Sequence, residues 1–122
     1  MPENLTYNDA LSYIMSALPM FQRVGGAAYK ANLDNTIALL NHLNNPQTKF
    51  RSIHIAGTNG KGSVSHCLAS IFQEAGYKTG LYTSPHLTDF RERIRINGTM
   101  IEKKYVWQFV EKNNRFLEKL KP

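Results

Sequence analysis

Apolar residues recur with the spacing of an amphipathic helix in four stretches of the chain. These stretches predict helices over residues 6–18, 33–43, 61–75 and 102–120. Residues that favour helix starts or stops mark their ends. Thr6 with Asp9 marks the start of the first helix, Pro19 and Pro46 follow the ends of the first and second helices, and Gly76 follows the third. The apolar stripe of each helix is expected to face a core.

Two short apolar runs, at residues 52–56 and 81–84, flank the third predicted helix. A helix between two strands predicts a β-α-β unit with parallel strands and a right-handed crossover. Further on, Asn97 and Gly98 lie between two apolar-polar runs, which predicts a β-hairpin. The expected fold class is therefore α/β, with a mostly parallel sheet flanked by helices and one hairpin.

The 122 residues are long enough for one compact domain. We expect a helical lead-in over residues 1–50, a β-α-β unit with hairpin over 51–101, and a closing helix over 102–120. No apolar run approaches the roughly 18 residues of a membrane span, and the N-terminus does not resemble a secretory signal. The cytoplasm is thus the default location, and the single cysteine, Cys67, is expected to be a small buried apolar residue.

The net charge of +6 favours anionic partners, which include nucleotides, polyanionic metabolites and nucleic acids. Part of this excess lies near the C-terminal end of the sequence, where lysines and arginines are mixed with glutamates. A solvated helix face explains that mixture more simply than an RNA-binding patch. Charge alone therefore does not select a partner.

Residues 57–63 have the chemistry of a phosphate-binding loop, although they do not fit the usual glycine-rich pattern, because Ile55 and Gly62 occupy two of its key positions. A phosphate needs backbone N–H groups, a helix N-terminus and a cation. The candidate residues for this site are Gly57, Thr58, Asn59, Gly60, Lys61, Gly62 and Ser63. Lys61 would reach terminal phosphate oxygens, and Ser63 is the nearest hydroxyl for a magnesium ion. The alternative is a tight strand-to-helix turn with a solvated lysine.

Three segments resemble the Mur ligase superfamily and, within it, the folylpolyglutamate synthase and dihydrofolate synthase family. They are IHIAGTNGKGS at residues 53–63, TSPHLTDFRERIRINGTMI at 83–101 and FQRVGGAAYKANLDNTIALLNHLNNPQ at 21–47. The resemblance implies an ATP-dependent enzyme that joins L-glutamate to folate or dihydropteroate through an acyl phosphate. It also implies ATP and Mg²⁺ as cofactors, small-molecule substrates, and no nucleic-acid or membrane partner.

The same resemblance implies roles for particular residues. Lys61 would neutralise the transferred phosphoryl group, and Ser84 would bind magnesium, the ion for which the loop itself offers the Ser63 hydroxyl. The carboxyl end of a strand, where Ser84 lies, is also where ligands of open parallel sheets collect. The family's pterin-side contact corresponds to Lys30, Ala31, Asn32 and Leu33. Asn32 stands where a glycine is common, and a plain helix cap is the alternative reading of this segment.

Other nearby residues are left outside the site. His86 either borders it or packs beneath the next loop, and Arg91, Glu92, Arg93 and Arg95 are read as one face of an amphipathic strand. The family's remaining magnesium ligands, its modified lysine and its C-terminal domain have no counterpart in this chain. The resemblance thus implies an incomplete N-terminal portion of a larger ATP-binding domain, expected to be inactive alone.

Two other classes remain open from the sequence. One is a P-loop kinase or nucleotidase, against which residues 83–101 argue, and the other is a non-enzymatic anion-binding or RNA-binding module. The sequence does not distinguish dihydrofolate synthase from folylpolyglutamate synthase. It does not fix the oligomeric state, for which a monomer is the default expectation.

Overall fold

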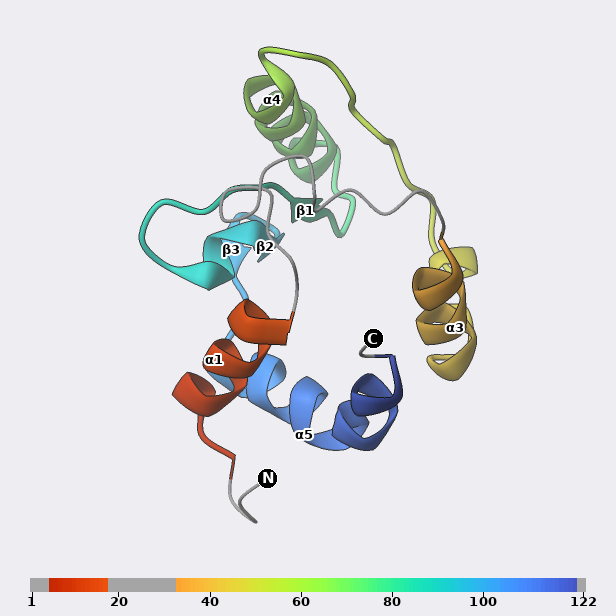
Figure 1. The fold of residues 1–122 in the computed structure, drawn as a ribbon. Helices are drawn as coiled ribbons and strands as arrows, with labels where there is room; N and C mark the ends of the chain where they lie inside the picture. Colours follow the sequence, from red (N-terminus) through yellow and green to blue (C-terminus); the bar gives the residue numbers. More distant parts are fainter. Residues whose placement is uncertain (1–4, 18–32, 121–122) are drawn as a thin grey trace. The chain divides into compact units, whose positions relative to one another are not determined.

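The computed structural model describes residues 5–17 and 33–120, and the chain divides into two compact units. The first, called here the helical unit, comprises residues 1–52 and 106–122. The second, called the glycine-loop unit, comprises residues 53–105. Figure 1 shows the helices and strands of both units, coloured along the chain.

Helix α1 (Tyr7–Ala17) starts where the sequence predicts. The Thr6 N–H donates to Asp9 Oδ2 at 3.0 Å, and the Asp9 N–H donates to Thr6 Oγ1 at 3.2 Å. This reciprocal pair is a capping box, which satisfies N–H groups that a helix start otherwise leaves unpaired. The pKa of Asp9 lies below its ordinary value because the Thr6 hydroxyl and N–H donate to its carboxylate. The predicted helix end at Leu18 and Pro19 lies outside the described residues.

The core of the helical unit joins α1 to helix α5 (Lys103–Lys119). Its members are Leu5, Ala10 and Val110, with Tyr13, Ile14 and Trp107 packed against them. On α5 the buried residues Val106, Val110 and Asn113 follow at intervals of four and three, so they share one helix face. The closing helix predicted over residues 102–120 is confirmed.

Helix α3 (Asp34–His42) confirms the second predicted helix, and its last residue contacts α5. The His42 ring stacks on the Phe116 ring with centroids 4.0 Å apart. Its Nε2 lies 3.1 Å from Asn113 Oδ1, while the Asn113 side-chain N–H donates to the Phe109 carbonyl at 2.8 Å. Because the amide nitrogen is used by Phe109, Asn113 Oδ1 is the acceptor for an Nε2–H of His42.

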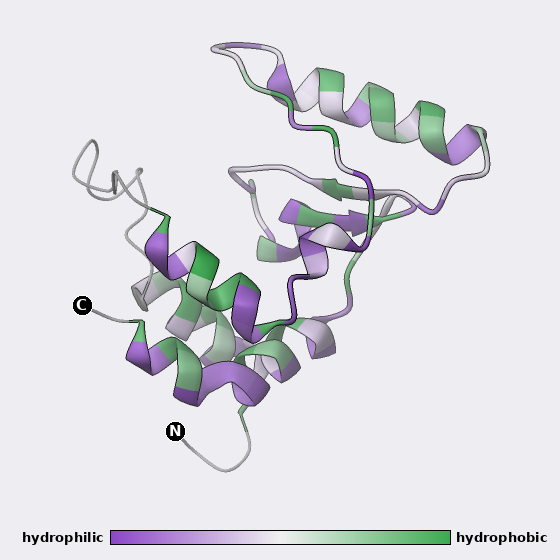
Figure 2. Ribbon diagram, turned by 90° about the vertical axis from the view of Figure 1, so that its right-hand side faces the viewer, coloured by the Kyte–Doolittle hydropathy of each residue, from purple (hydrophilic) through white to green (hydrophobic). Residues whose placement is uncertain are grey.

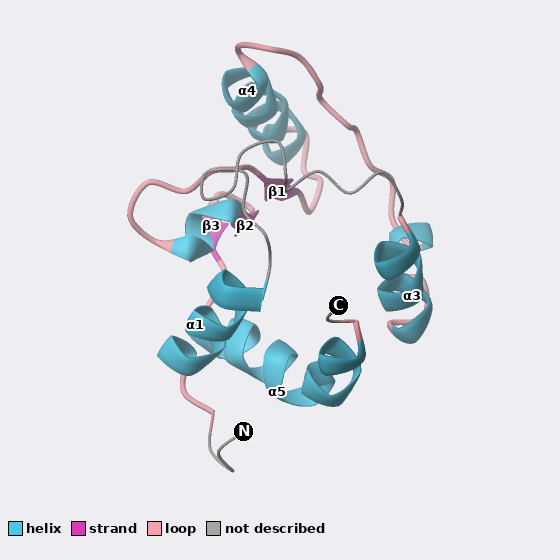
Figure 3. Cartoon of the chain, viewed as in Figure 1, coloured by secondary structure: helices cyan, strands magenta, loops and turns pink. Residues whose placement is uncertain are grey.

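The glycine-loop unit combines one helix with a small sheet (Figure 3). Its elements are α4 (Lys61–Glu74), β1 (Gly80–Tyr82), the 3₁₀ helix η3 (Phe90–Arg93), β2 (Ile94–Ile96) and β3 (Thr99–Met100). The strand order is β1-β2-β3, and both pairings are antiparallel. The predicted helix over residues 61–75 is thereby confirmed, and Gly76 follows it with the left-handed φ of 86° that a helix stop favours.

The hairpin predicted at Asn97 and Gly98 is confirmed. These residues connect β2 to β3 with φ values of 48° and 79°, the left-handed pair that a type I′ turn needs. Asn97 also bonds to Thr79 twice, through its N–H at 2.9 Å and through its side-chain oxygen, which accepts the Thr79 N–H at 2.8 Å. The turn therefore contacts the residue just before the start of β1 as well as closing the hairpin.

The predicted parallel arrangement is not found in the residues that the structure describes. Residues 52–56 form no strand, and β1 pairs with β2 rather than with them. The second predicted strand is also shorter than expected, because β1 ends at Tyr82. A strand exists only where a neighbour supplies ladder hydrogen bonds, and no described strand supplies them to residues 52–56. The coarser expectation of helices combined with a sheet holds.

Much of α4 is uncovered within its unit. Val64 is 49% exposed and Ile71 61% exposed, whereas Ala69 is buried. Figure 2 shows apolar residues along the length of this helix, at the top of the view. A helix of 14 residues is about 21 Å long, but a strand of three residues such as β1 covers about 10 Å.

Cys67 is exposed, so its predicted buried role is wrong. It precedes the buried Ala69 by two residues, which places it on roughly the opposite side of the helix. None of the described helices combines the length and apolar character that a membrane crossing requires.

Candidate functional site

The glycine loop leads directly into α4. Gly57 and Gly60 have positive φ values of 154° and 78°, and Gly60 is the residue that precedes the helix. Side chains other than glycine are strained in this conformation. The first hydrogen bond of the helix runs from the Val64 N–H to the Gly60 carbonyl at 3.0 Å. The N–H groups of Lys61, Gly62 and Ser63 thus lie in the first turn, where a helix leaves its donors available to an anion.

The Lys61 side chain turns back over this loop. Its Nζ donates to the carbonyl oxygens of Gly57 and of Thr58, the latter at 3.1 Å. Both acceptors belong to the loop itself, so the ammonium group is held at the loop rather than drawn to another part of the fold. Residues 57–63 are all exposed, and a Cβ placed at Gly60 or Gly62 would meet no atom within 4 Å. The loop combines a cation, first-turn N–H groups and open space.

The serine hydroxyls near the loop differ in their bonding. Ser65 Oγ donates to the Lys61 carbonyl at 2.7 Å, which occupies that hydroxyl within the helix. Ser63 lies in the first turn of α4 and is exposed. Ser84 follows β1 and precedes Pro85 through a cis peptide bond. Serine hydroxyls of this kind suit magnesium, which prefers oxygen ligands.

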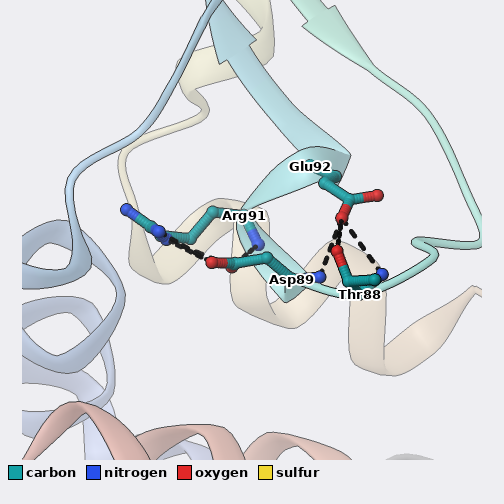
Figure 4. A network of polar contacts seen from close by, with 4 residues as sticks. All are labelled: Thr88, Asp89, Arg91 and Glu92. Carbon is teal, nitrogen blue, oxygen red and sulfur yellow. Dashed lines mark hydrogen bonds and ion pairs between the residues drawn. The ribbon is translucent and has the colours of Figure 1, made fainter.

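The segment after β1 is organised by Glu92, the third residue of η3 (Figure 4). One carboxylate oxygen accepts the Leu87 N–H at 2.9 Å, and the other accepts the Asp89 N–H at 2.8 Å. The second oxygen also accepts the N–H and the hydroxyl of Thr88 at 3.1 Å and 2.7 Å. These bonds, with that from Leu87 contributing most, lower the pKa of Glu92 from 4.5 to about 2.

Two further contacts complete this segment. Asp89 accepts the Arg91 N–H at 2.9 Å and forms an ion pair with the Arg91 guanidinium at 2.7 Å. The Arg93 Nε–H donates to His86 Nδ1 at 2.8 Å, so that nitrogen of His86 carries a lone pair. The interpretation of residues 91–93 as strand is therefore wrong. The spacing of Asp89 and Glu92 fits a helix-start box, a signal that the sequence contains and the strand reading missed.

Not all predicted site residues can be placed together. Lys30, Ala31 and Asn32 lie outside the described residues, and Leu33 precedes α3 in the helical unit, where it is 66% exposed. The glycine loop and Ser84 both belong to the other unit. Across the described ranges, no group of three or more histidine, cysteine, aspartate or glutamate residues is arranged to hold a metal ion.

Comparison with known proteins identifies relatives of one kind, although no family model matches the chain. The chain is 41% identical over 95 residues to dihydrofolate synthase/folylpolyglutamate synthase of Bacillus subtilis, covering 78% of this chain and 20% of the relative. It is 38% identical over 93 residues to folylpolyglutamate synthase of Lacticaseibacillus casei, covering 76% and 20%.

Solved structures agree with these relatives. Folylpolyglutamate synthase of Thermotoga maritima superposes with a TM-score of 0.79 at 36% identity, covering 93% of this chain and 24% of that one. The Lactobacillus casei enzyme gives a TM-score of 0.80 at 34% identity, covering 95% and 27%. The chain spans about a fifth to a quarter of the length of the proteins it matches. Sequence and fold together place this chain in the folylpolyglutamate synthase/dihydrofolate synthase family.

Proposed function

We propose that this chain supplies the ATP phosphate site of a ligase that joins L-glutamate to folate or dihydropteroate. The observation that carries the proposal is the Lys61 ammonium group, held on the carbonyls of Gly57 and Thr58 beside the first-turn N–H groups of α4. A related folylpolyglutamate synthase structure is a complex with AMPPCP and folate, with a TM-score of 0.77 to this chain at 34% identity.

A triphosphate is the ligand that fits this arrangement. A phosphate oxygen would replace the loop carbonyls as partner of Lys61, while the N–H groups from Thr58 to Gly62 cradle the phosphates. The small side chains of the loop permit that approach, because nothing lies within 4 Å of a Cβ at Gly60 or Gly62. Lys61 would then neutralise charge on the phosphoryl group during its transfer.

The chemistry proceeds in two substitutions. A substrate carboxylate oxygen attacks the γ-phosphorus, the bond to ADP breaks, and an acyl phosphate forms. The glutamate amine then attacks the acyl carbon, phosphate leaves, and the amine loses its proton. Phosphate is needed because a carboxylate oxygen by itself is a poor leaving group. Positioning and charge neutralisation are the main help that a protein gives to such a transfer.

Residues of this chain also fit a magnesium ion. Ser63 and Ser84 would hold it through their hydroxyl oxygens, whereas the Ser65 hydroxyl bonds to the Lys61 carbonyl. Magnesium, when bound, neutralises the phosphate oxygens and lowers the cost of transfer. The pterin side of the substrate would contact Lys30, Ala31, Asn32 and Leu33. We expect this 122-residue chain alone to bind the nucleotide without turning it over.

Calorimetric titration with AMPPCP and Mg²⁺ tests the nucleotide site. The wild-type chain should bind, and Lys61→Ala should weaken binding at least about tenfold, since a charge-assisted phosphate contact contributes about 1.5–3 kcal/mol. Lys112→Ala removes the same charge from an exposed position on α5 and is the matched control. Equal affinity of the Lys61→Ala and wild-type chains would remove the proposal.

Activity assays on a full-length protein that contains this chain test the reaction. ADP formation should require both a pteroyl substrate and glutamate. ADP formed without any amine would instead indicate a kinase or nucleotidase. Nucleic-acid binding that has a steep salt dependence and survives Lys61→Ala would indicate an RNA-binding module.

A further inference from the structure

The residues that follow β1 form a segment held at both ends by η3. At one end, the Thr83 N–H donates to the Arg93 carbonyl at 3.0 Å. At the other end, the N–H groups of Leu87, Thr88 and Asp89 point at the Glu92 carboxylate. Glu92 and Arg93 are adjacent, so two neighbouring residues fix a segment in which Ser84 lies between the two anchored ends.

Few side chains could replace Glu92 in this place. Three successive backbone N–H groups and one hydroxyl converge on it, and only an ionised carboxylate offers two oxygens that accept without donating. Hydrogen bonds to a charged acceptor are also stronger than those to a neutral one. A glutamine would keep one accepting oxygen, but its NH₂ group would face donors. Depending on its orientation, that group would meet either the Leu87 N–H or the donors of Thr88 and Asp89.

The middle of the segment has little freedom of its own. Pro85 fixes its φ and restricts the residue before it, which is Ser84. His86 is tied to the Arg93 side chain at 2.8 Å and lies edge-on to the Phe90 ring at 5.9 Å. The backbone position of Ser84 therefore depends on the anchors on either side of it, at Thr83 and at Leu87, Thr88 and Asp89.

We propose that Glu92 is a positioning residue, which holds residues 84–89 so that the Ser84 hydroxyl is set for a magnesium ion. This inference rests on the proposed function, in which Ser84 binds that ion. Glu92 itself does not touch the metal or the nucleotide. The hydrogen bonds that lower the pKa of Glu92 to about 2 keep the anchor charged near neutral pH.

Hydrogen exchange of individual amides tests the anchor without any ligand. Glu92→Ala should accelerate exchange at Leu87, Thr88 and Asp89 at least about tenfold, and Glu92→Gln should give an intermediate effect. Glu102→Gln is the matched control, because the Glu102 side chain is 63% exposed and forms an ion pair with Lys104. Unchanged exchange at residues 87–89 in both Glu92 variants would overturn the anchoring role.

Titration with Mg²⁺ at fixed AMPPCP tests the positioning. In Glu92→Ala the Mg²⁺ concentration that gives half of the Mg²⁺-dependent AMPPCP binding should rise about tenfold. The affinity for AMPPCP without metal should stay unchanged. Glu92→Gln should again lie between that variant and the wild type. This split separates positioning from general damage, which would weaken both measurements together.

The outcomes are distinguishable. Faster amide exchange in the Glu92 variants with an unchanged Mg²⁺ requirement would overturn the positioning of Ser84. An equal loss of Mg²⁺ affinity and of metal-free AMPPCP affinity in Glu92→Gln would overturn it as well. Absence of any Mg²⁺-dependent AMPPCP binding by the wild type would refute the proposed function and the metal part of this inference. The exchange data would still decide whether Glu92 anchors the segment.

Discussion

Adding one methyl group at Gly60 or at Gly62 should have opposite effects on stability. Gly60 has a φ of 78°, whereas no positive φ is found at Gly62, the second residue of α4. A Cβ at either position meets no atom within 4 Å, so packing does not enter the comparison. Only the backbone conformation differs.

The magnitudes follow from that difference. A left-handed alanine costs roughly 1–2 kcal/mol, and the stiffer unfolded chain returns about 0.4–1 kcal/mol. Gly60→Ala should therefore lower the free energy of unfolding by about 1 kcal/mol. Inside a helix, alanine is more favourable than glycine by up to about 1 kcal/mol. Gly62→Ala lies in the first turn, where it should raise the free energy of unfolding by about half of that amount. The two variants should differ by about 1.5 kcal/mol, or roughly tenfold in the unfolding equilibrium.

Urea denaturation followed by circular dichroism, at neutral pH and without ligand, measures the difference. The dependence on urea should be the same in all variants, so the midpoints can be compared directly. Gly60→Asn is an added control, because asparagine tolerates left-handed angles better than alanine and should cost less. Equal stability of Gly60→Ala and the wild type, or destabilisation by Gly62→Ala, would refute the backbone geometry of the loop.

Three further predictions concern the rest of the fold. Val110→Ala should destabilise the helical unit by about 2 kcal/mol, because Val110 is fully buried, whereas Val64→Ala, at a side chain 49% exposed, should change stability by less than about 0.5 kcal/mol in urea denaturation. His42→Ala should cost about 1–2 kcal/mol, since it leaves the buried Asn113 oxygen without its 3.1 Å partner, and a cost near zero in thermal unfolding would contradict that pairing. The pKa of Glu92 falls from 4.5 to about 2 on folding, so its contribution is complete above pH 4.5 and is lost as pH drops toward 2. Acid unfolding should thus be less steep in Glu92→Gln, and identical pH curves would argue against the bonds to Glu92.

Local signals in the sequence predicted the helices and the hairpin well. Thr6 with Asp9, and Asn97 with Gly98, act within a few residues, and the structure contains the cap and the turn that they encode. The glycine loop before α4 is another local feature. Its turn into the start of α4 follows from Gly57 and Gly60, whereas its phosphate-binding role stays a prediction.

Features that depend on distant partners could not be read in this way. Residues 52–56 have the composition of a strand, yet no described strand pairs with them. Strand formation needs hydrogen bonds to a second strand, and the composition of a segment does not show whether that partner is present. The exposure of Cys67 depends on which side of α4 meets the sheet. The error at residues 91–93 is different in kind, because alternating charges hid a local Asp89–Glu92 box.

Glu92 holds the path of its segment mainly through backbone groups, so that path does not depend on the Leu87 side chain. Its partners at Leu87 and Asp89 are backbone N–H groups, which every residue except proline possesses, and the Leu87 side chain is 91% exposed. Substitutions at position 87 can therefore alter what the protein presents to a neighbouring molecule while leaving the path of the chain intact. One acidic residue thus holds this turn through main-chain groups and leaves the outward side chain at position 87 without a part in holding it.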